Sequence, residues 1–206
     1  MKLIVYDCEI LNAIPDSITK LAPLEGIKYC QGWGDHAGMG ISVVCAYIWG
    51  EGYRVFLHDN LSELLALAMM PDNIMVGFNN HAFDDKLIRG QMSGEGLNFA
   101  ASSWDLAREV RRAKGMNPDA PGGGTGGLDG LARANFLSGK KSTANAPVDW
   151  QRGLWGKVID QCLLDVMLTK RLVELALDYR LRDTESGRKL AIDITALKPA
   201  VDQVEA

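Results

Sequence analysis

The order of its apolar segments constrains the fold of this chain more than any other feature. Three β-branched or aromatic segments come first, at residues 3–6, 38–49 and 53–59, and the turn 50–52 joins the last two as in a meander. Helical and strand-like patterns then alternate. Helical spacing covers residues 60–70 (with Asn60 as its N-cap), 84–89, 105–114, 128–136 and 155–177, whereas residues 73–79 and 102–105 are strand-like. This order predicts an α/β fold, in which a mixed sheet of three antiparallel strands and then parallel strands carries helices on both faces.

Length and composition predict one domain with two irregular segments. A chain of 206 residues that is 47% apolar supports one sizeable core, so we expect a single domain over residues 1–206. Residues 115–127 are rich in glycine and proline, which predicts a mobile loop. Residues 179–195 surround a Glu-Ser-Gly turn and predict a C-terminal hairpin.

Charge and cysteine usage favour a protein that stays inside a cell. The net charge of −4 gives no general attraction to nucleic acids or acidic membranes, although a local basic surface is compatible with it. The four cysteines are scattered without a C-x-x-C pair, as in reduced cytoplasmic proteins. No apolar run resembles a signal peptide or reaches the length of a membrane span. We therefore expect a cytoplasmic protein without a membrane partner, in the host cytoplasm if the chain is viral.

Two acids close the first apolar strand. Asp7 and Glu9 are two residues apart, so their side chains project to the same face of the strand, and a cation between them would relieve their repulsion. The same triplet recurs at Asp183 and Glu185, in a polar turn where no metal is needed. Spacing alone leaves the metal interpretation of Asp7 and Glu9 and a chance occurrence about equally favoured.

Two further acids lie where an α/β sheet could bring them to the same place. Asp84 follows a buried strand at an expected helix start, where it is either a ligand or, more simply, a helix cap. Asp165 borders the apolar stripe of the helix at 155–177, although a surface position beside Lys170 or Arg171 is the alternative. The four acids would make one cluster if the strand ends and the helix meet.

The chain resembles the DEDD 3′→5′ exonucleases, a family with the ribonuclease H-like fold. The stretches YDCE, GFNNHAFDD and VIDQCLLDVMLTKRL are similar to the three exonuclease motifs in order and spacing. The intervening GGLDGLARANF, SGKKS and APVDWQRG are similar to the connecting stretches in exonucleases carried by bacteriophages. The resemblance covers about residues 1–172 and implies a ribonuclease H-like fold with phosphodiester hydrolase activity.

The resemblance also implies a metal site. Enzymes of this family hold two divalent ions, so Asp7 would bridge both, Glu9 and Asp165 would complete the first, and Asp84 would hold the second. Hard oxygen ligands without a histidine or cysteine cluster favour Mg²⁺ or Mn²⁺ over zinc.

The substrate implied by the resemblance is a single-stranded 3′ end, with DNA preferred over RNA and with short oligonucleotides as a variant. Ile10, Leu11 and Phe78 are candidates for the apolar wall against the last base, or are simply core residues. Asn80 either contacts the substrate or closes a turn. A replication or recombination partner is conceivable, and the sequence identifies none.

A basic segment supports nucleic-acid binding to a limited extent. Seven basic residues between positions 108 and 141 stand against three acids, which gives a local charge of +4. Lys140 and Lys141 close this segment and are candidate phosphate contacts, or else part of a solvated helix face.

One position departs from the family pattern. The third motif normally carries a tyrosine four residues before the last aspartate or a histidine five before it, and here these positions hold Gln161 and Asp160. Gln161 cannot accept a proton but can orient a water molecule, whereas Asp160 could act as a base. His81, three residues before Asp84, is the other candidate base, and a structural hydrogen bond is its simpler role.

Two classes of function follow. The first is an active metal-dependent 3′→5′ exonuclease that releases nucleoside monophosphates, and the second is a module on the same fold that holds 3′ ends with weakened hydrolysis. Retention of all four carboxylates favours the enzyme, because clustered negative charge does not help a binding protein that must hold phosphates.

Overall fold

A computed structural model describes residues 1–15, 23–92, 103–120, 125–136 and 145–205. The loop predicted at residues 115–127 lies partly outside this described part, and Lys140 and Lys141 lie wholly outside it.

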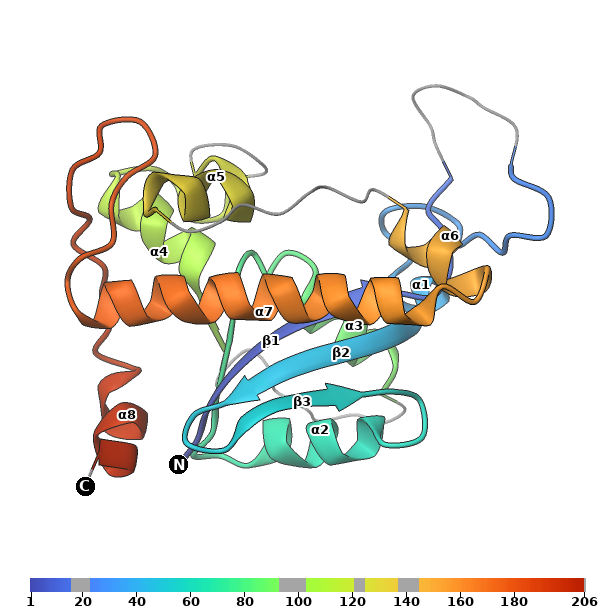
Figure 1. The fold of residues 1–206 in the computed structure, drawn as a ribbon, viewed down its shortest axis with the longest axis horizontal. Helices are drawn as coiled ribbons and strands as arrows, with labels where there is room; N and C mark the ends of the chain where they lie inside the picture. The colour runs from blue at the N-terminus through green and yellow to red at the C-terminus, as the bar shows by residue number, and fades with distance from the viewer. Residues whose placement is uncertain (16–22, 93–102, 121–124, 137–144, 206) are drawn as a thin grey trace.

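One mixed sheet forms the centre of the molecule (Figure 1), with strand order β3-β2-β1-β4-β5. The strands are β1 (Leu3–Ile10), β2 (Ile41–Ile48), β3 (Gly52–Phe56), β4 (Ile74–Gly77) and β5 (Ser103–Asp105). The pairs β1–β2 and β2–β3 are antiparallel, whereas β1–β4 and β4–β5 are parallel. The predicted mixed sheet of three antiparallel strands followed by parallel ones is therefore confirmed, and β1 is its central strand.

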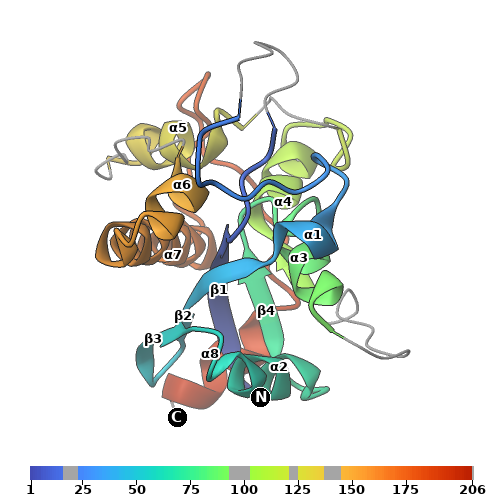
Figure 2. The same ribbon diagram turned by 90° about the vertical axis from the view of Figure 1, so that its right-hand side faces the viewer.

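Helices cover both faces of the sheet. They are α1 (His36–Met39), α2 (Leu61–Met69), α3 (Asp84–Gly90), α4 (Leu106–Ala113), α5 (Gly127–Ala134), α6 (Ala146–Gln151), α7 (Trp155–Leu177) and α8 (Lys198–Glu205). Figure 2 places α7 and α3 on opposite sides of β1. The period-two alternation of β1 explains this arrangement, because a strand presents successive side chains to opposite layers.

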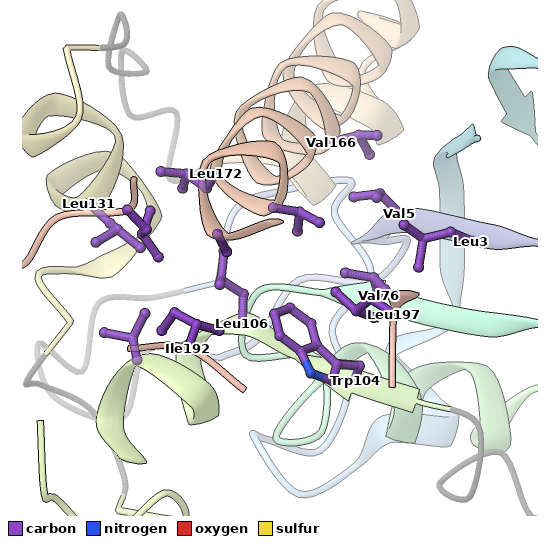
Figure 3. Packing of buried hydrophobic residues seen from close by; sticks show 14 of the residues in the cluster. Leu3, Val5, Val76, Trp104, Leu106, Leu131, Val166, Leu172, Ile192 and Leu197 are labelled. Carbon is purple, nitrogen blue, oxygen red and sulfur yellow. The ribbon is translucent and has the colours of Figure 1, made fainter. Parts of the chain in front are cut away.

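Two buried clusters reflect that alternation. Leu3 and Val5 pack with α7 residues such as Val166 in the first cluster, part of which is drawn in Figure 3. Ile4 and Tyr6 face the second cluster, which α1, α2 and α3 complete. Burying each large apolar side chain contributes about 1.5–3 kcal/mol, so both faces of β1 are firmly held.

Several local features differ from the sequence-based expectation. The short helices α1 and α6 and the C-terminal helix α8 were not expected. The Asn60 side chain accepts from Leu57 N at 2.6 Å and makes no cap bond to α2. In the segment predicted as a C-terminal hairpin the chain turns back on itself, with one antiparallel bridge between Arg182 and Lys189 and with backbone hydrogen bonds from Asp183 N to Arg188 O and from Leu190 N to Leu181 O, both at 2.8 Å. Among the described residues, no helix combines the length and the apolar character that a bilayer crossing requires.

Candidate active site

Three carboxylates converge at the carboxyl end of β1. Oxygen atoms of Asp7, Glu9 and Asp165 all lie within 4.8 Å of one another. Asp7 and Glu9 are half-buried on one side of β1, and Asp165 is buried on α7. The Cys162 thiol donates to the Asp7 carbonyl at 3.3 Å, so the turn of α7 that precedes Asp165 is docked against this part of the strand. Three acids this close create a strong negative potential, which a divalent cation would offset.

Asp84 approaches the same end of β1 from the opposite layer. Its Oδ1 accepts from Cys8 N, between Asp7 and Glu9, at 3.0 Å. Burial raises the pKa of Asp84 to about 7, and the negative charge of Asp85 adds to this effect, while the Cys8 hydrogen bond opposes it. Asp84 lines the same cavity as the three acids but is not a member of the group within 4.8 Å.

The neighbouring acid, Asp85, holds the surrounding elements together. It is buried and accepts hydrogen bonds from the Tyr6 hydroxyl on β1, from Ser103 Oγ on β5 at 3.0 Å, and from Asn80 Nδ2 at 3.3 Å. Asn80 is fully buried and also donates to Ser103 Oγ at 2.7 Å. The Asn80 side chain thus links the turn before α3 to β5, and it does not line the cavity.

A cavity of about 1230 Å³ opens over the four acids. It is larger than a typical small-molecule pocket, so it has room for a polymeric ligand. Of the residues expected to contact substrate, Ile10, Phe78 and His81 line it. Gln161 lines it as well, one helical turn before Asp165. Asp160 is exposed and does not line the cavity, so its side chain is poorly placed to act as a base there.

His81 takes part in a structural network. Its Nε2 bonds to the Ser103 carbonyl at 3.1 Å, and its Nδ1 accepts from the Arg108 guanidinium. Asp105, at the end of β5, accepts from the backbone N–H groups of Asn79 and His81 and caps α4 by accepting from Ala107 N and Arg108 N. Both ring nitrogens of His81 are therefore engaged in hydrogen bonds.

The second acidic triplet lies apart from the carboxylate group. Asp183 and Glu185 both pair with Lys114, at 2.8 and 3.2 Å. Hydrogen bonds from Lys114 and Ser186 hold the pKa of Asp183 well below its usual range. Neither acid lines the cavity.

Sequence reasoning missed several cavity residues. Arg111 is buried, with Nη1 donating to the Pro118 carbonyl at 3.0 Å, and Arg108 pairs with Asp119 at 2.8 Å. Trp33, in the long β1–β2 connection, also lines the cavity. The charge count had marked the two arginines only as members of a basic segment, and no pattern in the sequence marked Trp33.

Comparisons with known proteins address the fold alone. The sequence matches no protein-family model, and no curated protein matches it. The family B DNA polymerase from the hyperthermophilic archaeon Pyrobaculum calidifontis is 16% identical with a TM-score of 0.54, over 95% of this chain and 27% of the polymerase. E. coli exonuclease I in complex with a dT13 oligonucleotide is 15% identical with a TM-score of 0.49, over 85% of this chain and 40% of the enzyme. A zinc-bound complex of the same enzyme with single-stranded DNA is 13% identical with a TM-score of 0.48, over 86% of this chain and 40% of the enzyme.

This chain therefore spans less than half the length of these proteins. Its five-stranded sheet, with antiparallel strands on one side of β1 and parallel strands on the other, has the ribonuclease H-like α/β architecture that the sequence predicted.

Proposed function

We propose that this protein is a metal-dependent 3′→5′ exonuclease that acts on single-stranded DNA. The observation that supports it most is the group formed by Asp7, Glu9 and Asp165, whose oxygen atoms lie within 4.8 Å of one another beneath an open cavity. Asp84 borders the same cavity from the other layer of the fold.

The donor set fits a hard divalent cation. Asp7, Glu9 and Asp165 would hold one Mg²⁺ or Mn²⁺ ion, and Asp84 with Asp7 would hold a second. Ions bound there supply an activated water and charge stabilisation for the departing 3′ oxygen. Carboxylates this close repel one another when they are ionised, and a bound divalent cation would relieve that repulsion.

The residues of the chain have distinct tasks in this proposal. Gln161, one turn before Asp165, orients the attacking water through its amide, because it cannot take up a proton. Ile10 and Phe78 face the terminal nucleotide, and Arg108 attracts its phosphates. His81 holds Arg108 in place through the Nδ1 hydrogen bond.

A labelled-strand assay tests the activity. A 5′-labelled single strand should shorten stepwise in Mg²⁺ or Mn²⁺, should stay intact in EDTA, and should resist when its 3′ end is phosphorylated. Asp7→Asn should abolish cleavage, because it weakens the coordination of both ions. Glu63→Gln, which changes an exposed acid on α2, is the matched control and should cleave normally.

Other outcomes identify the alternatives. Faster cleavage of an RNA strand would make the enzyme an exoribonuclease, and cutting of a circular strand would make it an endonuclease. Binding of 3′ ends without any metal-dependent cleavage would replace the enzyme by a 3′-end binding module. Gln161 favours this second function, because it stands where the third motif normally has a tyrosine and it cannot accept a proton.

A further inference from the structure

The cavity has two chemically different walls. Asn79, Asp105 and Arg108 give one side a polar and charged character. The other side is contributed mainly by the connection between β1 and β2, and there the lining is apolar or aromatic: Ile14, Pro15, Pro23, Leu24, Tyr29 and Trp33. A ligand that fits both walls must combine charged groups with flat apolar surfaces.

Trp33 is the most exposed aromatic residue of the apolar wall. It is 69% exposed, although a tryptophan is usually mostly covered in a folded protein. Its backbone is nevertheless fixed, because Asp35 N donates to Gly32 O at 3.0 Å and the Asp35 carboxylate accepts from Gln31 N at 2.8 Å and from Gly38 N at 2.9 Å. An exposed indole on a well-anchored turn offers its face to a ligand without a large ordering cost.

The same turn is fixed relative to the carboxylates. The Trp33 ring packs at 6.3 Å from the ring of Phe83, the residue immediately before Asp84. Behind it, α1 packs on α3 so closely that a Cβ at Gly90 would lie 3.0 Å from Ala37 N. The Trp33 indole therefore lies beside the residue that directly precedes Asp84.

We propose that Trp33 is a base-stacking residue, which holds a nucleobase near the 3′ end of a single strand against the apolar wall while the phosphates face the charged wall. The inference rests on the proposed function and deepens it by naming a specificity residue. Every base has a flat face, so stacking on an indole tolerates any sequence. Inside a duplex both faces of a base are covered by the neighbouring base pairs, so this contact favours an unpaired strand over the interior of a duplex.

Binding and cleavage measured together test the stacking role. The protein, Trp33→Ala and Trp33→Phe are titrated with an oligothymidylate single strand and with a matched strand whose last two 3′ nucleotides lack bases. Titrations are run in EDTA and in Ca²⁺, and cleavage rates in Mg²⁺ give KM and kcat. Trp33→Ala should raise Kd and KM for the normal strand about 5- to 150-fold, which corresponds to one stacked base. It should change kcat little and should leave the baseless strand unaffected, while Trp33→Phe should retain most of the affinity.

Trp155→Ala is the matched control, since Trp155 is 58% exposed at the start of α7 but does not line the cavity. It should bind both strands as the unsubstituted protein does. Equal losses on the normal and the baseless strand would overturn the stacking role, as would normal affinity of Trp33→Ala. Base-dependent binding through Trp33 without any cleavage would retain the inference and reject the exonuclease. Metal-dependent cleavage whose KM is the same with and without Trp33 would retain the exonuclease and reject the stacking role.

Discussion

Replacing Asp84 by asparagine should stabilise the metal-free protein at alkaline pH. The carboxylate of Asp84 is buried beside Asp85, and its pKa is raised to about 7. Asparagine is nearly isosteric, carries no charge, and keeps an oxygen that can accept the hydrogen bond from Cys8 N. The substitution therefore removes the cost of a buried charge without removing the local contact.

The size and sign of the effect follow from proton linkage. The folded protein keeps the Asp84 proton up to about pH 7, whereas the unfolded chain releases it near pH 4. Stability therefore falls as pH rises between these two values, and the full penalty is present above pH 7. A difference of about three pKa units corresponds to about 4 kcal/mol, and partial solvent access from the cavity lowers this to about 2–4 kcal/mol. The advantage of Asp84→Asn should be about 1 kcal/mol at pH 5 and reach its full size at pH 8.

Urea unfolding in EDTA at pH 5 and pH 8 measures this difference, with Glu63→Gln as the control for loss of an exposed acid. Added Mg²⁺ should reverse part of the advantage, because a bound ion stabilises the unsubstituted carboxylate and not the amide. The reasoning would be refuted if Asp84→Asn were no more stable than the unsubstituted protein at pH 8, or if its advantage were the same at both pH values.

Three further predictions concern individual contacts. Tyr6→Phe should lower the free energy of unfolding by about 1.5–3 kcal/mol, since the buried Asp85 carboxylate loses a donor, and denaturant unfolding at pH 7 would show it. Gln161→Ala should slow cleavage of a labelled strand about 10- to 100-fold while metal affinity is kept, and higher pH should partly restore the rate. Lys114→Met should cost about 2–3 kcal/mol at pH 7, because it leaves the Asp183 carboxylate without its cationic partner. Because Lys114 lowers the pKa of Asp183, that loss should shrink as pH falls below about 4, and unfolding curves from pH 7 to pH 3 would check it.

The regular elements were predictable because their apolar patterns are long. The stripe over residues 155–177 coincides with α7, and the β1 alternation assigned Ile4 and Tyr6 to one layer and Asp7 and Glu9 to the other side. The four-residue helix α1 has no such pattern, since capping by Asp35 and close packing at Gly90 fix it in the folded state.

The candidate site was only partly predictable for a similar reason. A carboxylate at the end of a strand, such as Asp7, or beside the apolar stripe of a helix, such as Asp165, can be identified from the local sequence alone. The tasks of Asp85 and Asp105 depend on which donors the fold brings to them, namely Tyr6 from β1 and the N–H groups of the 79–81 turn. A lone tryptophan in an irregular connection, such as Trp33, likewise has no sequence pattern that predicts its position in a cavity lining.

The two elements that carry the three clustered acids also set the time at which the site can exist. Asp7 and Glu9 lie on the first strand of the chain, and Asp165 is on the long helix that follows the whole sheet. A nascent chain that has emerged only through α6 has two of the three acids and no helix to dock on that face of β1. Domains fold as units as synthesis proceeds, so the proposed nuclease activity begins only after α7 has left the ribosome. During most of its own translation the chain would therefore lack the proposed activity.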